Sequence, residues 1–246
     1  MKNSEEWRPT KYVLHGRTLL ASRDPEQVAV ASRLIVDCVA RLYGECLPLH
    51  ARGRLLDLGC GTVPLYGVYR WHVWETVCVD WANTMHVNYH LDFECDLTKP
   101  LPFADDEFHT IILSDVLEHI PEPELLWNEM ARILAPNGKL LLSVPFFYWV
   151  HEAPDDYYRY TSFALRRFAE RSGLKLLRLD PLGGAPEVLA DIFSKNVIRL
   201  PIVGRSIAEA IQWGVGAFVK TRFGARISAA TAENFPLGYF LIAEKA

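Results

Sequence analysis

Short apolar runs closed by glycine, aspartate or proline recur along this chain, and helical segments alternate with them. The clearest runs are RLLDLG (54–59), TVCVD (76–80), HTIILSD (109–115) and KLLLSVP (139–145). Runs of this length are typical of strands that are buried on both faces of a parallel sheet. Residues 25–44, 122–134 and 161–173 have helical spacing instead. This alternation predicts a parallel sheet with helices on both faces.

The full pattern predicts a Rossmann-like α/β fold in a single domain over residues 1–246. We expect a seven-stranded, mostly parallel sheet, completed by LKLLRLD (174–180) and GYFLIAEK (238–245). About 50 N-terminal residues are expected to form a helical cap, with Pro25 in the first turn of the 25–44 helix. A helical insertion is expected over about 184–235, before the last strand, and Ser206 with Glu209 predicts a capping box there.

Composition indicates a globular protein with no strongly basic character. The chain is 50% hydrophobic with a net charge of −4, which argues against a nucleic-acid partner. The N-terminal residues contain no apolar signal core, and no apolar run is long enough for a spanning helix. Five cysteines without a C-x-x-C pair are expected to stay reduced, namely Cys38, Cys46, Cys60, Cys78 and Cys95. We therefore expect a cytoplasmic location, with membrane contact left open.

A glycine turn follows the first of these strands. Gly59 and Gly61 match the first two glycines of a dinucleotide-binding turn, but Pro64 occupies the place of the third. Glycine allows a sharp turn and a close approach of ligand to backbone. The third glycine permits the packing that accompanies tight pyrophosphate binding. The turn therefore predicts a nucleoside ligand without a pyrophosphate.

Five ordered motifs together resemble the class I S-adenosylmethionine-dependent methyltransferases, and most closely their small type 11 group. These motifs are DLGCG, the strand-end Asp80, DLTKPLPF, SDVLEHI and LAPNGKLLLSVP. They cover residues 54–180, and the final GYFLIAEK strand extends the likeness. The resemblance implies S-adenosyl-L-methionine as cofactor and S-adenosyl-L-homocysteine as product. Val63 departs from the pattern, because many relatives have a third glycine there.

The resemblance also implies which residues bind the cofactor. Asp57, Gly59 and Gly61 are expected at its methionine end, and Asp80 at the ribose. Trp81 is expected near the adenine, with Asp96 and the Leu97 backbone at its amino group. The implied set is completed by Cys60, Ser114, Asp115 and His119. Asp96 has an alternative role in capping the turn that follows it, and His119 has an alternative structural role.

The loop after the fifth strand, KLLLSVP, is PFFYWVHEAPDDYYRYT (145–161), and it is dense in aromatic and titratable residues. It resembles a segment in methyltransferases of bacterial glycan and surface-polysaccharide clusters. A hydroxyl needs a base to remove its proton as the new bond forms, and imidazole titrates near neutrality. We therefore predict His151 as general base, with Tyr157, Tyr158 and Arg159 positioning the acceptor. The alternative is a structural lid in which Asp156 and Arg159 pair with each other.

A second histidine-rich segment gives a weaker signal. His86, His90, Asp92 and Cys95 have side chains that can bind metals. They lack the spacing of known metal motifs, so we expect no metal site there or elsewhere in the chain.

The leading function is O-methylation of a sugar or glycan-like hydroxyl. The alternatives are a methyltransferase for small molecules or natural products and a non-catalytic module that binds the cofactor. Residues 192–228 carry six basic side chains against one acid, Glu209, namely Lys195, Arg199, Arg205, Lys220, Arg222 and Arg226. This segment predicts either peripheral contact with the anionic inner membrane face or a helical cover packed on the protein or on a second subunit.

Overall fold

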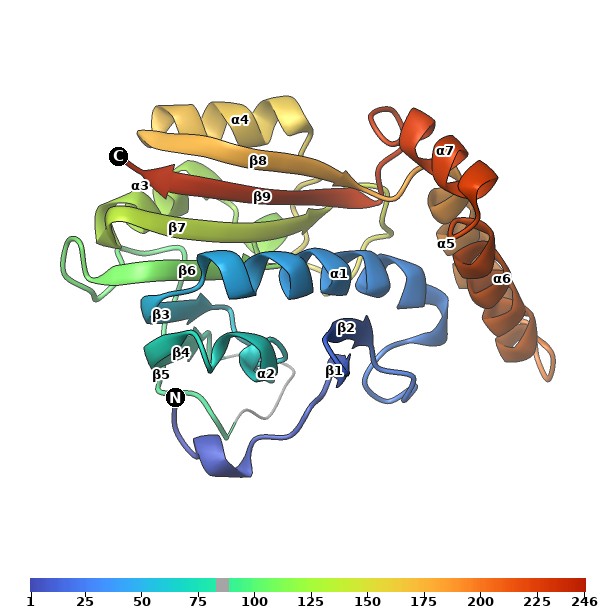
Figure 1. The fold of residues 1–246 in the computed structure, drawn as a ribbon, viewed down its shortest axis with the longest axis horizontal. Coiled ribbons are helices and arrows are strands. Elements are labelled where there is room, and N and C mark those ends of the chain that lie inside the picture. The colour runs from blue at the N-terminus through green and yellow to red at the C-terminus, as the bar shows by residue number, and fades with distance from the viewer. Residues whose placement is uncertain (83–88) are drawn as a thin grey trace.

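The computed structural model describes residues 1–82 and 89–246, and its centre is a seven-stranded sheet. Within the described residues the strand order is β5-β4-β3-β6-β7-β9-β8 (Figure 1). The strands are β3 (Gly53–Leu58), β4 (Val73–Asp80), β5 (Phe93–Glu94), β6 (Phe108–Ser114), β7 (Leu134–Pro145), β8 (Leu174–Leu182) and β9 (Gly238–Lys245). β9 runs antiparallel to both of its neighbours, and the other pairs are parallel. The predicted Rossmann-like, mostly parallel fold is confirmed.

Two hydrophobic cores form because successive residues of a strand point to opposite faces of the sheet. Leu56, Ile111 and Leu140 belong to the core that contains Trp127 and Leu165. The latter two lie on α3 (Pro123–Ile133) and α4 (Ser162–Arg171). Their neighbours Leu55, Ile112 and Leu141 belong to the other core, with residues of α1 (Arg33–His50) and α2 (Tyr66–Tyr69). In Figure 1, α1 and α2 lie in front of the sheet.

The N-terminal segment is only partly helical, which corrects the predicted helical cap over residues 1–50. It contains the short helices η1 (Ser4–Glu6) and η2 (Val30–Ser32) and a hairpin of β1 (Tyr12–His15) and β2 (Thr18–Ala21). Gly16 is the first loop residue of this hairpin and has φ +61°. The hairpin signal was present in the sequence, as a glycine-containing pair between two apolar runs.

Helix α1 begins at Arg33 and ends at His50, so the predicted 25–44 helix was placed too early. Asp24 forms a separate turn, in which its side chain accepts from the Glu26 amide and its carbonyl accepts from the Val28 amide. Val28 and Ala31 are buried as predicted, but they lie outside α1. The apolar spacing therefore identified buried residues correctly without fixing the start of the helix.

Three other boundaries test the sequence rules. Thr161 caps α4 by accepting from the Ala164 amide, as one of the two predicted caps. The predicted turn at 135–138 is an irregularity within β7, where Asn137 has φ +59°. The predicted capping box of Ser206 and Glu209 was wrong, because its helix begins at Gly204 and encloses both residues.

The insertion before β9 forms three helices, α5 (Ala185–Val197), α6 (Gly204–Phe218) and α7 (Arg222–Thr231). They lie together to one side of the sheet, at the right of Figure 1. No helix among the described residues combines the length and apolar character needed to cross a bilayer.

Candidate active site

A cavity of about 970 Å³ opens at the carboxyl ends of the parallel strands. This edge is where ligands bind in open parallel sheets. All of the predicted cofactor residues line the cavity, namely Asp57, Gly59, Cys60, Gly61, Asp80, Trp81, Asp96, Leu97, Ser114, Asp115 and His119. The volume is at the upper end of the usual range of roughly 300–1,000 Å³ for small-molecule sites, so a second ligand fits beside a nucleoside.

The glycine turn has the conformation that its sequence predicts. Gly59 has φ +65°, and a Cβ there would lie 2.6 Å from Val116 Cγ2. Gly61 has φ +49° with open space on its Cβ side. Val63 also has φ +53°, although it is a fully buried β-branched residue. The backbone thus keeps a glycine-like conformation at the position where this chain departs from the family pattern.

Two carboxylates lie at the base of this turn. Asp80 accepts from the amides of Gly61 and Trp81, both at 2.9 Å. Asp57 is buried and accepts from the Tyr69 hydroxyl at 3.1 Å. Burial raises the pKa of Asp57 to about 7; Tyr69 opposes the rise and the negative charge of Asp80 adds to it. A cationic ligand group at this position would favour the ionised form of Asp57.

The residues expected at the adenine form an open part of the cavity wall. Trp81 lines the cavity and is 42% exposed, whereas Leu97 is buried. Asp96 accepts from the Thr98 amide and hydroxyl and pairs with Lys99. Lys99 and Thr98 lower the pKa of Asp96 to about 2. Asp96 therefore caps its turn, as the alternative predicts, and also lines the cavity.

Lys11 reaches the end of β6 from the N-terminal segment, and sequence reasoning missed it. Its ammonium lies 2.8 Å from Asp115 Oδ2, and the Ser143 hydroxyl donates to Asp115 Oδ1. Burial alone would raise the pKa of Asp115, but the Lys11 charge and the hydrogen bonds from Lys11 and Ser143 together outweigh it, and the pKa is lowered. Ser114 meets the same Ser143 hydroxyl at 3.2 Å. The N-terminal segment thus supplies one wall of the site.

The predicted catalytic residues separate into two groups. His151 and Tyr157 line the cavity, whereas Tyr158 and Arg159 do not. The Tyr158 hydroxyl donates to the Pro121 carbonyl. Arg159 pairs with Asp156 and also donates to the carbonyls of Tyr148 and Trp149. Tyr158 and Arg159 therefore hold the loop in place, which matches the alternative of an Asp156–Arg159 pair.

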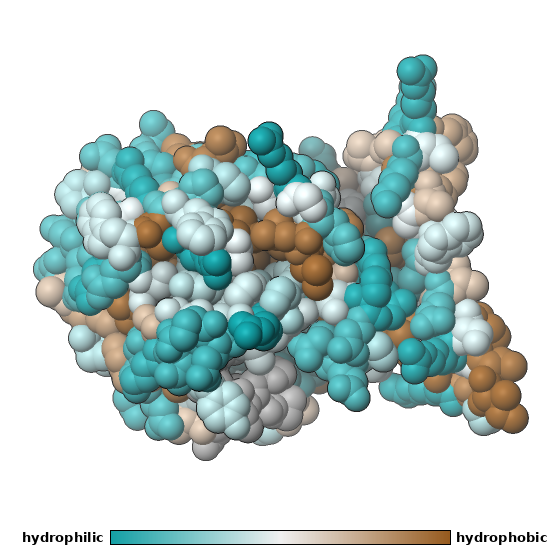
Figure 2. Space-filling model, turned by 60° about the horizontal axis from the view of Figure 1, so that its bottom comes forward, coloured by the Kyte–Doolittle hydropathy of each residue, from teal (hydrophilic) through white to brown (hydrophobic). Residues whose placement is uncertain are grey.

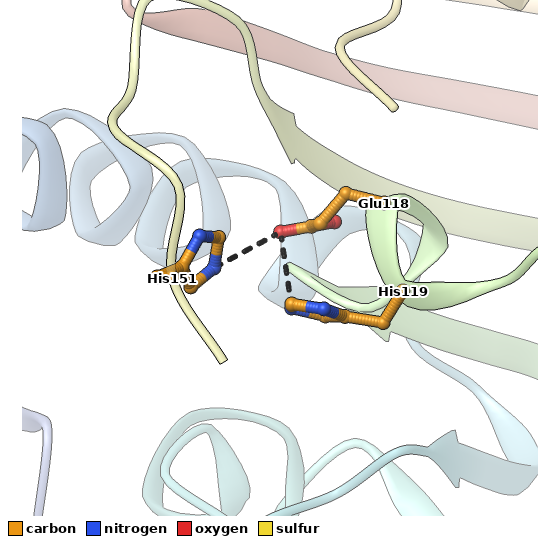
Figure 3. Close-up of side chains that lie close together, drawn as sticks. All are labelled: Glu118, His119 and His151. Carbon is orange, nitrogen blue, oxygen red and sulfur yellow. Dashed lines mark ion pairs between the residues drawn. The ribbon is translucent and has the colours of Figure 1, made fainter. Parts of the chain in front are cut away.

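Glu118, His119 and His151 meet at the cavity wall (Figure 3). Glu118 and His119 come from η3 (Leu117–His119) and His151 from the loop after β7. Glu118 Oε1 lies 3.8 Å from His119 Nε2 and 3.9 Å from His151 Nε2. Burial raises the pKa of Glu118 well above its usual value, with Asp115 adding to the rise. Burial and then His119 lower the pKa of His151, which leaves a neutral imidazole able to accept a proton.

The structure describes three of the four residues of the histidine-rich segment, His90, Asp92 and Cys95. His86 lies outside the described residues. Asp92 accepts from the Cys78 amide and pairs with the N-terminal ammonium of Met1. Cys95 is buried in a hydrophobic core. Among the described residues, the group whose donor atoms could hold a metal ion is instead Glu118, His119 and His151.

Comparisons with known proteins place this chain in one family. The family profile described as "Methyltransferase domain" matches residues 30–179. An uncharacterized methyltransferase of Mycobacterium marinum is 37% identical over 121 residues, which are 47% of this chain and 40% of that protein. The demethylmenaquinone methyltransferase of Renibacterium salmoninarum is 29% identical over 116 residues, 45% of this chain and 46% of that protein. The chain thus spans less than half the length of these curated relatives.

Solved structures agree in fold. A SAM-dependent methyltransferase from Archaeoglobus fulgidus superposes with a TM-score of 0.55 at 18% identity, over 82% of this chain and 90% of that one. At this identity the likeness concerns the fold alone.

Proposed function

This chain belongs to the methyltransferase-domain family and uses S-adenosyl-L-methionine as its cofactor, and on that premise we propose that it methylates a hydroxyl of a sugar or glycan-like acceptor. The observation that carries the proposal is the position of the His151 imidazole. It lies in the same cavity as the predicted cofactor residues, and burial favours its neutral form. A neutral imidazole at the methyl donor suits an acceptor that must lose a proton.

The aromatic residues of the loop support an acceptor with a ring. Tyr148 and Tyr157 line the cavity beside His151. Tyr157 is 45% exposed, and its hydroxyl donates to Asp155 at 3.1 Å. An aromatic face packs against the apolar C–H surface of a ring, and the polar groups around it bind hydroxyls. These features favour a polyhydroxylated ring over a purely apolar acceptor.

The reaction requires alignment more than covalent chemistry by the protein. The acceptor oxygen attacks the methyl carbon in line with the carbon–sulfur bond, and the bonding pair stays on sulfur in S-adenosyl-L-homocysteine. In the predicted mechanism His151 takes the hydroxyl proton as the oxygen–carbon bond forms. Tyr158 and Arg159 contribute by holding the loop that presents His151.

The proposal is tested with isotopically labelled methyl donor and a panel of sugars, short glycans, phenols and carboxylic acids. We expect label in a sugar product that survives alkaline hydrolysis, because an ether is stable to alkali whereas a methyl ester is cleaved. Transfer only to phenols, to carboxylates or to carbon would contradict the proposal.

Replacement of His151 gives a first prediction. His151→Ala is expected to lower kcat by roughly 10²–10⁴-fold, the usual contribution of a positioned general base. The rise in melting temperature caused by S-adenosyl-L-homocysteine should stay as in the parent protein, because the predicted cofactor contacts are elsewhere. Unchanged turnover with unchanged cofactor binding would remove His151 from the reaction.

A further inference from the structure

Glu118 is a buried carboxylate for which the described structure provides no hydrogen-bond donor. Its side chain has no solvent exposure, and neither Oε1 nor Oε2 has a hydrogen-bond partner. The two imidazole nitrogens at 3.8 and 3.9 Å are too distant for hydrogen bonds. A buried polar group without a partner is costly, and native structures nearly always provide one. Glu118 therefore requires a partner that fits between the three side chains.

His119 is oriented so that one nitrogen lone pair points toward Glu118. Its Nδ1 lies 2.6 Å from the Asp155 carbonyl oxygen. A carbonyl can only accept, so Nδ1 carries the proton and Nε2 keeps its lone pair. Metal-binding histidines almost always have this arrangement, in which the other ring nitrogen donates to a carbonyl or a carboxylate.

His151 has a carboxylate beside the same ring nitrogen, without a hydrogen bond between them. Its Nδ1 lies 3.3 Å from Asp156 Oδ2, and its Nε2 faces Glu118 Oε1. Arg159 holds Asp156 in place through two contacts, to Oδ1 at 2.5 Å and to Oδ2 at 2.7 Å. Asp156 Oδ2 accepts instead from the His151 backbone amide at 2.9 Å. Asp156 and Arg159 thus fix the backbone that carries His151, whose Nε2 lies toward Glu118.

We propose that Glu118, His119 and His151 bind one divalent transition-metal ion, of which Zn²⁺ and Mn²⁺ are the probes that suit the donors. The three donor atoms lie within 4.8 Å of one another, and in Figure 3 the two imidazoles lie next to the same Glu118 oxygen. Two imidazoles and one carboxylate with open positions form a known catalytic donor set. Zinc bonds of 2.0–2.1 Å separate tetrahedral ligands by about 3.4 Å. The distances from Glu118 therefore need to shorten by only about half an ångström.

The remaining coordination positions face the cavity, because all three ligands line it. Glu152 also lines it, and its Oε2 lies 3.9 Å from His119 Nε2. Glu152 can supply a fourth ligand or accept a proton from a molecule bound to the ion. This site departs from our expectation of a chain without metal. The sequence did not reveal it, because His151 is distant along the chain from the Glu118–His119 pair.

The consequence for catalysis rests on the proposed function. An acceptor hydroxyl bound to the ion loses its proton more readily than a free hydroxyl. The proton passes to Glu152 or to water, the oxygen forms a bond to the methyl carbon, and the carbon–sulfur bond breaks with its electron pair left on sulfur. His151 then acts as a ligand, and the ion replaces it in activating the hydroxyl. Methyl transfer to oxygen is common to both mechanisms.

The test is calorimetric titration of untagged, chelator-treated protein with ZnCl₂, with MnCl₂ and with MgCl₂ in separate runs. We expect one site per chain for zinc or manganese and much weaker magnesium binding. Glu118→Gln, which keeps the shape of the side chain, and His151→Asn should each weaken that binding at least 100-fold. His72→Ala is the matched control, because His72 is exposed and lies away from the cavity, and it should bind as the parent does.

Binding that is absent from the parent, or equal in parent, Glu118→Gln and His151→Asn proteins, would overturn the proposal. Melting curves with and without metal give a second measurement: the ion should raise the melting temperature of the parent and leave that of Glu118→Gln unchanged. The two proposals fail separately. Methylation of sugar hydroxyls in the presence of chelator would exclude the metal from the reaction and keep the proposed function. Metal binding by a protein that methylates no hydroxyl would contradict the proposed function and support the metal site.

Discussion

Asp57 is the residue whose ionisation links the cofactor site to stability. Its pKa is raised from 3.8 to about 7 in the folded protein, so the folded state holds a proton that the unfolded state releases. The group therefore favours folding below about pH 4, and this contribution is lost as the pH rises to about 7. A residue needed in ionised form by a cationic ligand thus destabilises the protein when that ligand is absent.

The variant Asp57→Asn tests whether ionisation of Asp57 destabilises the protein. The amide keeps the contact with Tyr69 and cannot ionise. Without cofactor, the variant should equal the parent near pH 4 and exceed its unfolding free energy above pH 7 by roughly 1–4 kcal/mol, because one pKa unit corresponds to about 1.4 kcal/mol. Urea unfolding of both proteins from pH 4 to 8 measures the difference. A difference that does not change with pH would contradict the assignment, and the variant should bind S-adenosyl-L-homocysteine more weakly.

Val63 gives a second prediction, from backbone conformation. Its φ of +53° lies in the left-handed region, which costs an L-residue about 1–2 kcal/mol and glycine almost nothing. Val63→Ala and Val63→Gly both remove the buried side chain, but only glycine relieves the backbone. We therefore expect Val63→Gly to be about 1 kcal/mol more stable than Val63→Ala by urea unfolding. The usual order, with alanine the more stable, would show that the turn relaxes away from this conformation.

The residues of the cofactor site were predictable because their positions follow from one rule. Asp57 is the penultimate residue of β3, Asp80 is the last of β4 and Asp115 directly follows β6, and parallel strands bring such residues to one edge. Lys11 and the Glu118–His151 contact were not predictable. They depend on how the N-terminal segment and the loop after β7 fold back over the edge, and no local spacing in the sequence encodes that path.

At the scale of elements, α5 fixes the wall of the cavity through a buried ion pair. Lys195 Nζ lies 2.5 Å from Asp191 Oδ2 and 3.3 Å from the centre of the Tyr148 ring. Tyr148 lines the cavity. Sequence reasoning counted Lys195 among the basic residues available to a membrane, and its burial corrects that assignment. The insertion therefore contributes to the site by holding Tyr148.

Lys195→Met is expected to destabilise the protein by about 3–5 kcal/mol, because it leaves Asp191 buried without its cation. Replacing both residues, as Asp191→Leu with Lys195→Met, should restore most of the loss, since no uncompensated charge remains. Thermal or urea unfolding of the parent, single and double variants measures this, with the exposed Lys220→Met as control. A double variant as unstable as the single one would show that packing, and not charge, is responsible.

The strands β3, β4 and β6 were predicted more accurately than helix α1. A buried strand is a continuous apolar run with clear ends, whereas apolar spacing reports burial without reporting conformation. This is why Val28 and Ala31 were assigned to a helix that begins only at Arg33. Gly44 and Pro48 also failed to end that helix where sequence rules would place its end.

At the scale of the molecule, the insertion exposes apolar and basic side chains together, and we propose that it contacts an anionic membrane surface. Ile202 is fully exposed, and Trp213 and Phe223 are 78% and 68% exposed. Figure 2 shows hydrophobic surface over the end of this helical arm, at its right. Five of the six basic side chains of the insertion are exposed, namely Arg199, Arg205, Lys220, Arg222 and Arg226. This combination is typical of peripheral attachment.

The protein should therefore co-sediment with vesicles that contain anionic lipid at low salt, and less with neutral vesicles. Ile202→Glu and the pair Arg222→Glu with Arg226→Glu should each reduce the bound fraction severalfold, whereas Arg166→Glu on α4, an exposed control, should not. Absence of binding to anionic vesicles would contradict the proposed membrane contact. A dimer in light scattering that the same substitutions dissociate would assign the surface to a second subunit.

The place of β9 in the sheet has a consequence for how the protein is made. β9 lies between β7 and β8, so β8 joins the sheet only through β9. Along the chain, the whole insertion separates β8 from β9. As the chain leaves the ribosome, β3 to β7 can assemble while β8 still has no partner. α5, α6 and α7 must then emerge before β9 arrives and joins the two parts. A nascent chain stalled within the insertion should therefore keep the edge of β7 open to chaperones, and release of β9 should close it.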